Sequence, residues 1–222
     1  MKVCTETVRR ALHHLKLRWR RPRPVPPEKQ RLLEILRLLV TMPDDEVAVF
    51  HDETEVHLNP KIGFAWMRRG HQKAVLSGGV NWHSGKPLVV LGAKKVTEVF
   101  VQFLEHARTR LRCYHKIHVI ADQDRSHTSG GIAEYLQRWE HRIQVHLLPS
   151  WSPDANPMEP IWLVLHHTVT RNHGESDLEE LLVYSEEFLQ DKQPFPLKLP
   201  MVYAPLMELL KDEGVQSSCV LI

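Results

Sequence analysis

The stretch Val47-Ala48-Val49-Phe50-His51-Asp52-Glu53 joins a short apolar run to an acidic end. β-Branched residues in a run of this length predict a buried strand that delivers the carboxylate of Asp52 at its end. The stretch Ile117-His118-Val119-Ile120-Ala121-Asp122 has the same design. Because the carboxyl ends of neighbouring parallel strands share one edge of a sheet, we expect Asp52 and Asp122 to lie close together there.

Strand and helix patterns alternate around these two segments. We expect further strands near 64–67, 73–82, 87–91 and 143–148, and helices near 28–40, 96–110, 131–140 and from about residue 156. A hairpin series followed by alternating strands and helices is typical of an α/β layer with a mixed sheet. No apolar run reaches the ~20 residues of a membrane span and no signal peptide opens the chain, so we expect a cytoplasmic, nucleoid-associated protein without membrane contact.

Basic residues gather at the start of the chain. Residues 1–24 hold eight lysines and arginines and one glutamate, a net charge of +7, so the remainder carries −5. A basic arm on an acidic body is expected where the arm binds phosphate and the body binds metal ions. The alternative is a solvated tail that binds nothing. Apolar spacing from Thr5 to Leu15 predicts a short amphipathic helix, and the prolines at 22–27 predict an extended linker.

A third carboxylate lies in the stretch Ser152-Pro153-Asp154-Ala155-Asn156-Pro157-Met158-Glu159. Asn156 is a suitable helix cap and Pro157 a suitable first helical residue, so Glu159 should face the sheet edge from the first turn. Three carboxylates offer the oxygen ligands that Mg²⁺ prefers, and two ions ~3.5–4 Å apart promote phosphodiester displacement. In the alternative, strand-end aspartates are turn residues and Glu159 only stabilises the helix dipole.

These segments together resemble the mariner-type transposase superfamily, in particular bacterial transposases of the insertion-sequence six-thirty family. Ser152 to Trp162 is similar to the motif Ser-Pro-[Asp/Glu]-x-Asn-Pro-[Ile/Val]-Glu-x-x-Trp, with Met158 at the branched position. Asp122-Gln123-Asp124-Arg125-Ser126-His127 resembles the motif Asp-Asn-x-x-x-His, with Gln123 in place of asparagine. Asp52-Glu53 resembles the first motif, and 36 residues separate Asp122 from Glu159, close to the usual spacing.

The resemblance implies a ribonuclease-H-like mixed sheet flanked by helices, preceded by a remnant of a helix-turn-helix DNA-binding domain. It implies that Asp52, Asp122 and Glu159 are catalytic and bind two Mg²⁺ or Mn²⁺ ions. The implied activity is that of a transposase, which cleaves transposon ends and transfers them into target DNA. The implied partners are double-stranded DNA, as terminal repeats and as target, and a second copy of the chain in a homodimer.

The resemblance also implies how the chain is organised into domains and segments. Residues 1–24 are expected to be the remnant of the helix-turn-helix domain, whose preceding helices are absent. Residues 25–45 are expected to form a linker and helix, and residues 46–191 the catalytic domain. The resemblance is lost in residues 192–222, which we expect to be a divergent tail.

Several further residues are candidates for supporting roles. Asp124 is interpreted as a turn residue, and the alternative is a substitute metal ligand. The resemblance implies that His127 either supports a metal ligand or contacts DNA, and the alternative is a surface histidine. His51 and His57 flank Asp52, yet they lack the spacing of a zinc site. The arginines of the arm and of the hairpin at 61–73 are candidate phosphate contacts, although a charged hairpin can also be merely exposed. These arginines are Arg9, Arg10, Arg18, Arg20, Arg21, Arg68 and Arg69.

Two other functions fit the same residues. One is a metal-dependent nuclease of the same fold that cleaves without strand transfer. The other is an inactive DNA-binding or dimerising relic of a transposase, which would cleave no DNA.

The charge of the arm leads to a first prediction. We expect the chain to bind duplex DNA weakly, with little sequence preference and a steep loss of affinity as salt rises, because phosphate attraction persists when the helices that brace a recognition helix are missing. Titration against terminal-repeat and scrambled duplexes across a salt series measures this. A preference of ~1000-fold for the terminal repeat would contradict it.

Overall fold

A five-stranded mixed sheet organises the chain, in the order β3-β2-β1-β4-β5. The computed structural model describes residues 6, 9, 14, 27–58, 73–92, 97–123, 130–150, 152–171, 173–175 and 177–212. Strands β1 (Glu46–His57), β2 (Lys73–Asn81) and β3 (Pro87–Gly92) form an antiparallel meander. Strands β4 (Lys116–Ala121) and β5 (Ile143–Leu147) continue the sheet in parallel with β1. The predicted mixed α/β sheet is confirmed.

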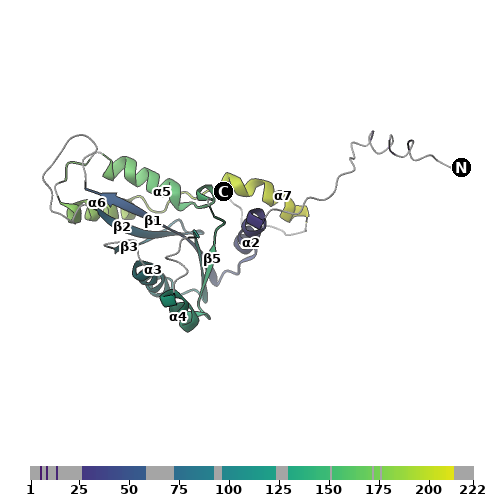
Figure 1. Cartoon of the computed structure of the whole chain (residues 1–222), viewed down its shortest axis with the longest axis horizontal. Coiled ribbons are helices and arrows are strands. Elements are labelled where there is room, and N and C mark those ends of the chain that lie inside the picture. Colours follow the sequence, from purple (N-terminus) through teal and green to yellow (C-terminus); the bar gives the residue numbers. More distant parts are fainter. Residues whose placement is uncertain are drawn as a thin grey trace.

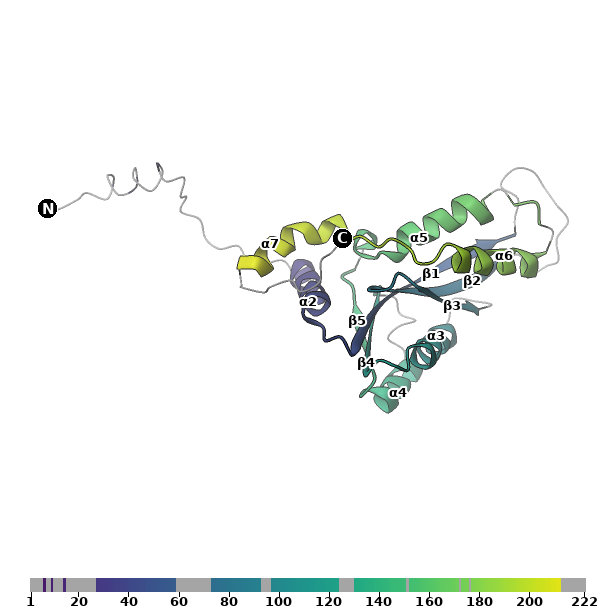
Figure 2. The same cartoon turned by 180° about the vertical axis from the view of Figure 1, so that it is seen from behind.

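Alternation along β1 sends side chains into two cores, one on each face of the sheet. Val47 and Val49 pack with helices α3 (Thr97–Arg110) and α4 (Gly130–Trp139). Ala48 and Phe50 belong to the other core, which α2 (Pro27–Thr41), α5 (Met158–Leu165), α6 (Leu178–Asp191) and α7 (Ala204–Asp212) cover. Figures 1 and 2 show α3 and α4 on one side of the sheet and α2, α5 and α7 on the other.

Both segments that flank the expected catalytic domain contribute to this second core. In α2, Ile35 and Leu36 are almost completely buried, and so is Tyr203 of the 3₁₀ turn η4 (Met201–Tyr203). Leu206 and Leu210 of α7 are buried in the same core. The expected linker helix and part of the expected divergent tail therefore pack against the sheet, while the domain boundaries themselves stay predictions.

The structure differs from two of the expectations, and a third concerns residues outside the described part of the chain. The prediction that the first strand ends at Asp52 is wrong, because β1 continues to His57 while it remains paired with β2. Helix α5 begins at Met158, after the 3₁₀ turn η2 (Pro153–Ala155), and so starts slightly later than expected. The strand near 64–67 and nearly all of the N-terminal helix lie outside the described residues.

No helix in the described part of the chain has the length and apolar character to cross a membrane.

Close packing of α5 on the sheet depends on Gly78. This glycine lies opposite Asp52 in the β1–β2 pairing. A Cβ atom added to it would sit 2.5 Å from Cη2 of Trp162 and 3.3 Å from Cε of Met158. The indole of Trp162 therefore occupies the space that any side chain at position 78 would need, and α5 lies directly on the strands that carry Asp52.

We accordingly predict that Gly78→Ala destabilises the fold by about 1–3 kcal/mol, the usual cost of overpacking a core. The control is Gly174→Ala, since an added Cβ there meets nothing within 4 Å. Urea unfolding of the two variants measures the difference. Equal stabilities would show that α5 is not held against the sheet as described.

Candidate active site

The register of β1 and β4 relates Asp52 to Asp122. The parallel pairing of these strands ends at Phe50 and Ile120, which lie opposite one another and point into the same core. Asp52 and Asp122 each follow two residues later, Asp52 within β1 and Asp122 just after β4. If the alternation of side chains and the ~4.8 Å spacing of neighbouring strands continue past the last pair, the register predicts that these two half-buried aspartates lie side by side on the face that α5 covers.

Asn156 connects this edge to the start of α5. Its side chain is buried, with 4% of its surface exposed. The amide Nδ2 donates a hydrogen bond to the backbone oxygen of His51 at 2.9 Å, and Oδ1 accepts one from the backbone N–H of Met158 at 3.1 Å. One side chain thus joins the residue before Asp52 to the residue before Glu159. The prediction that Asn156 is the helix cap and Pro157 the first helical residue is wrong by one position, because Pro157 is the N-cap and Met158 the first helical residue. The side chain of Asn156 nevertheless accepts a hydrogen bond from the N–H of that first residue.

Glu159 lies in the first turn of α5, between side chains that anchor the helix. Met158, Ile161 and Trp162 are buried, whereas Glu159 remains exposed. Burial of part of the carboxyl raises the pKa of Glu159, and the negative charges of Asp122 and Asp154 raise it further. Asp122 and Glu159 are therefore close enough to interact electrostatically. This interaction links the first turn of α5 to the end of β4.

The donor chemistry of Asp52, Asp122 and Glu159 fits a divalent cation. All three offer carboxylate oxygens, the ligands that Mg²⁺ prefers, and a cation would relieve the repulsion that raises the pKa of Glu159. Within the described residues, no three side chains of metal-binding type already converge as a closed ligand group. The shared metal site therefore stays a prediction, to which the strand register and Asn156 lend a geometric basis.

The histidine before Asp52 faces away from these carboxylates. His51 is completely buried on the side of α3, where its ring contacts Phe100 and Phe103 at centroid distances of 4.8 and 4.3 Å. Its Nε2 shares a hydrogen bond with Oγ of Ser77 at 2.8 Å. His57, by contrast, is exposed and pairs with Glu55. This arrangement gives no support to a zinc site that uses both histidines.

A polar contact that sequence reasoning missed lies farther along the same face of β1. Oγ1 of Thr54 shares a hydrogen bond with Nε2 of His166 at 2.7 Å, and Nδ1 of His166 contacts Oγ1 of Thr170 at 2.6 Å. His166 begins the π-helical turn η3 (His166–Thr170), and such turns occur often at functional sites. The contact ties the far end of α5 to β1. No sequence pattern signalled it, because a threonine and a histidine so far apart carry no recognisable spacing.

Most of the other candidate residues lie outside the described part of the chain. Among the candidate DNA contacts, the structure describes only Arg9, which is exposed and forms a 2.8 Å ion pair with Glu6. The candidates that lie outside the described residues are Arg10, Arg18, Arg20, Arg21, Arg68, Arg69, Asp124 and His127. Their predicted roles in DNA binding and metal support stay predictions.

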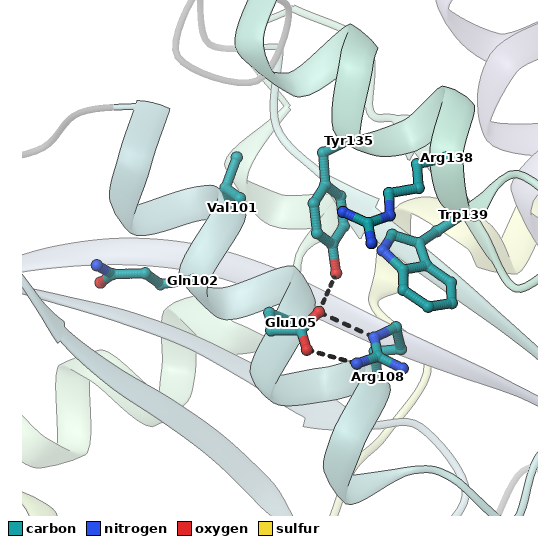
Figure 3. Close-up of a pocket in the computed structure, with 7 residues that line it drawn as sticks. All are labelled: Val101, Gln102, Glu105, Arg108, Tyr135, Arg138 and Trp139. Atoms are coloured by element: carbon teal, nitrogen blue, oxygen red, sulfur yellow. Dashed lines mark hydrogen bonds and ion pairs between the residues drawn. The ribbon is translucent and has the colours of Figure 1, made fainter.

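A separate groove lies between α3 and α4, on the face of the sheet opposite α5 (Figure 3). It encloses about 520 Å³. Glu105 pairs with Arg108, accepts a 2.7 Å hydrogen bond from the Tyr135 hydroxyl and has its pKa lowered to about 2, chiefly by Arg108. The guanidinium of Arg108 stacks on Trp139, 4.1 Å from the ring centroid. The carboxylate in this groove is already engaged, so the groove lacks the ligand set of a metal site.

Comparison with known proteins finds a relative similar over most of this chain. The chain is 32% identical over 205 residues to the insertion element IS630 uncharacterized 39 kDa protein of Shigella sonnei; the match covers 86% of this chain and 60% of that protein. The chain therefore spans less than two thirds of the length of this relative.

Solved structures show the same fold. The catalytic domain of Mos1 mariner transposase superposes with a TM-score of 0.53 at 15% identity, over 86% of this chain and 93% of that one. The Mos1 paired-end complex with the left transposon end matches with a TM-score of 0.52 at 16% identity, over 94% of this chain and 68% of that one. The expected ribonuclease-H-like sheet with flanking helices is thus confirmed. The helix-turn-helix remnant lies outside the described residues.

A family model described as the DDE superfamily endonuclease matches residues 47–182. This range is more than half of the chain and includes Asp52, Asp122 and Glu159. The resemblance inferred from the sequence motifs is therefore confirmed, and the chain belongs to the DDE endonuclease superfamily, a family of enzymes.

Proposed function

We propose that this chain is the catalytic part of a DNA transposase, which cleaves transposon ends and joins them to target DNA. Asp52, Asp122 and Glu159 are its metal ligands and catalytic residues, and two Mg²⁺ or Mn²⁺ ions are its cofactors. The observation that carries the proposal is the pairing of Phe50 with Ile120, two residues before Asp52 and Asp122, together with the negative charge of Asp122 that raises the pKa of Glu159.

The relatives support this proposal and suggest the partners. The Shigella relative is the product of an insertion element, and Mos1 structures have been solved as paired-end complexes with Mg and with Mn. By analogy, we propose that this chain binds terminal repeats and target DNA as a homodimer, at the nucleoid of the cell. Since the chain spans 60% of its Shigella relative, the activity of the whole protein is part of the proposal.

The three carboxylates come from different elements of the fold. Asp52 and Asp122 come from adjacent strands and offer rigid ligands, while Glu159 closes the set from α5. Bound divalent ions supply a Lewis acid at the scissile phosphate and lower the pKa of a bound water. Asn156 holds α5 at a fixed position relative to β1, so that Glu159 need not reorganise when DNA binds. Partial burial and the charges of Asp122 and Asp154 raise the pKa of Glu159, and a neighbouring cation would favour its ionised form.

Substitution of each carboxylate tests the assignment. Asp52→Asn, Asp122→Asn and Glu159→Gln keep the side-chain shape and remove the ligand charge. Each should reduce Mn²⁺-dependent nicking of DNA by more than ~100-fold, because even residues that only support metal ligands are worth 10–100-fold. A gel assay with a supercoiled substrate measures nicking, and a two-end DNA substrate measures strand transfer.

The matched control is Asp124→Asn, which alters the neighbouring aspartate and should have a mild effect. Damage equal to that of Asp122→Asn would show that the wrong aspartate has been assigned. Nicking without strand transfer would favour a simple nuclease, and the absence of nicking under all conditions would favour an inactive relic.

The raised pKa of Glu159 gives a prediction that does not depend on activity. Without divalent ions, Glu159→Gln should raise the thermal unfolding midpoint near pH 7, because the ionised carboxylate is disfavoured in the folded state. Below the ordinary pKa range of glutamate, both the folded and the unfolded chain carry a neutral Glu159, so the gain should disappear in acid. Added Mg²⁺ should stabilise the wild type more than the variant.

Calorimetry across pH, with and without Mg²⁺, measures this effect. The control is Glu98→Gln, which changes an exposed glutamate in the first turn of α3 and should leave the midpoint unchanged or slightly lower. A lower midpoint for Glu159→Gln, with no difference in the response to Mg²⁺, would contradict the crowding of carboxylates at this site.

A further inference from the structure

The chain after α6 returns across the face of the sheet that carries the carboxylates. The backbone N–H of Phe195 donates a 2.8 Å hydrogen bond to the oxygen of Gly85 in the β2–β3 turn. Gly85 has a φ of 63°, and an added Cβ would collide with the backbone of Phe195. Phe195, Leu197 and Leu199 then pack against the core on this face. The segment 193–203 is therefore fixed to the sheet before the chain enters α7.

Tyr203 stands at the point where this segment meets the loop of the third carboxylate. It has no exposed surface and is the largest fully buried side chain among the described residues. Its hydroxyl donates a hydrogen bond of 3.4 Å to the backbone oxygen of Ala155, a residue that is also completely buried. Burial raises the pKa of Tyr203, so the hydroxyl keeps its proton and remains a donor.

The loop 152–157 is therefore held from two sides. On the sheet side, Asn156 donates to the backbone oxygen of His51. On the other side, η2 packs against η4, where the ring of Tyr203 lies behind Ala155. Within the loop, the backbone supplies short-range bonds from Ala155 to Ser152 and from Asn156 to Pro153. Short-range bonds set the shape of the turn, and only contacts with other segments fix its position on the sheet.

We propose that Tyr203 is a positioning residue for Glu159, and that segment 193–203, which ends at Tyr203, is a working part of the carboxylate site rather than a divergent appendage. The ring presses Ala155 toward the sheet, which keeps Asn156 within reach of His51 and sets the start of α5. The 3.4 Å hydrogen bond is long, so packing of the ring supplies most of the effect. The link to metal binding rests on the proposed function.

Hydrogen exchange tests the positioning without relying on activity. In the full chain, Tyr203→Leu should accelerate exchange of the amides of Ala155, Asn156, Met158 and Glu159 by ~10-fold or more. Tyr203→Phe keeps the ring and should stay within about 3-fold of wild type, because it loses one weak hydrogen bond. If Tyr203→Leu does not fold, Tyr203→Met takes its place, since the flexible, unbranched methionine side chain adapts better to an irregular gap.

The matched control is Leu206→Ala, which removes a side chain with 3% exposure from the helix that follows this segment. This side chain lies on α7, which packs against α2, so its loss should destabilise the core without loosening the loop locally. Comparison is made at equal global stability, adjusted with urea. Equal exchange of the four loop amides in Tyr203→Leu and Leu206→Ala would overturn the positioning role.

A metal titration tests the consequence for the carboxylates. The Mn²⁺ concentration for half-maximal nicking should rise ~10-fold in Tyr203→Leu, with much of the rate restored at saturating Mn²⁺, and stay unchanged in Leu206→Ala. An unchanged Mn²⁺ requirement in Tyr203→Leu would overturn the link to Glu159. If the wild type nicks no DNA, the proposed function fails, and hydrogen exchange alone then decides whether Tyr203 positions the loop.

Discussion

The two hydrogen bonds of the Asn156 side chain are the interaction on which the site depends. They connect the backbone of His51 in β1 to the backbone of Met158 in α5, and the residues that follow these two are Asp52 and Glu159. A buried amide that satisfies one acceptor and one donor is costly to lose, since both backbone groups would remain buried without a partner. Asparagine is suited to this position because its side chain donates and accepts at once.

The remaining contacts make this bridge effective. Gly78 leaves room for Trp162, so that α5 lies directly on β1 and β2. Thr54 and His166 fasten the far end of the helix to the same strand, and Tyr203 supports the loop from behind. Three segments distant in the sequence thus fix one helix, whose first turn carries the third carboxylate. The proposed metal site would benefit from such rigidity, because carboxylates that repel one another could not relax apart.

The sequence predicted the parts of this architecture that follow from local patterns. Apolar runs before Asp52 and Asp122 identified the two central strands, and the Asn-Pro pair before Met158 identified the start of α5. The continuation of β1 to His57 could not be predicted, because it depends on pairing with β2, a long-range contact. The burial of Tyr203 and the bond between Thr54 and His166 escaped prediction for the same reason. Residues 192–212 match no motif, yet their apolar side chains complete the core over α2.

We propose that strand register and the Asn156 bridge bring Asp52, Asp122 and Glu159 to one metal site. A crystal structure of the full chain with Mn²⁺, with data collected at the manganese absorption edge, is the most direct test. We expect anomalous peaks between the three carboxylates, with oxygen ligands from strand β1, from the end of strand β4 and from helix α5. Manganese bound elsewhere, or any of the three carboxylates more than ~10 Å from the other two, would contradict it.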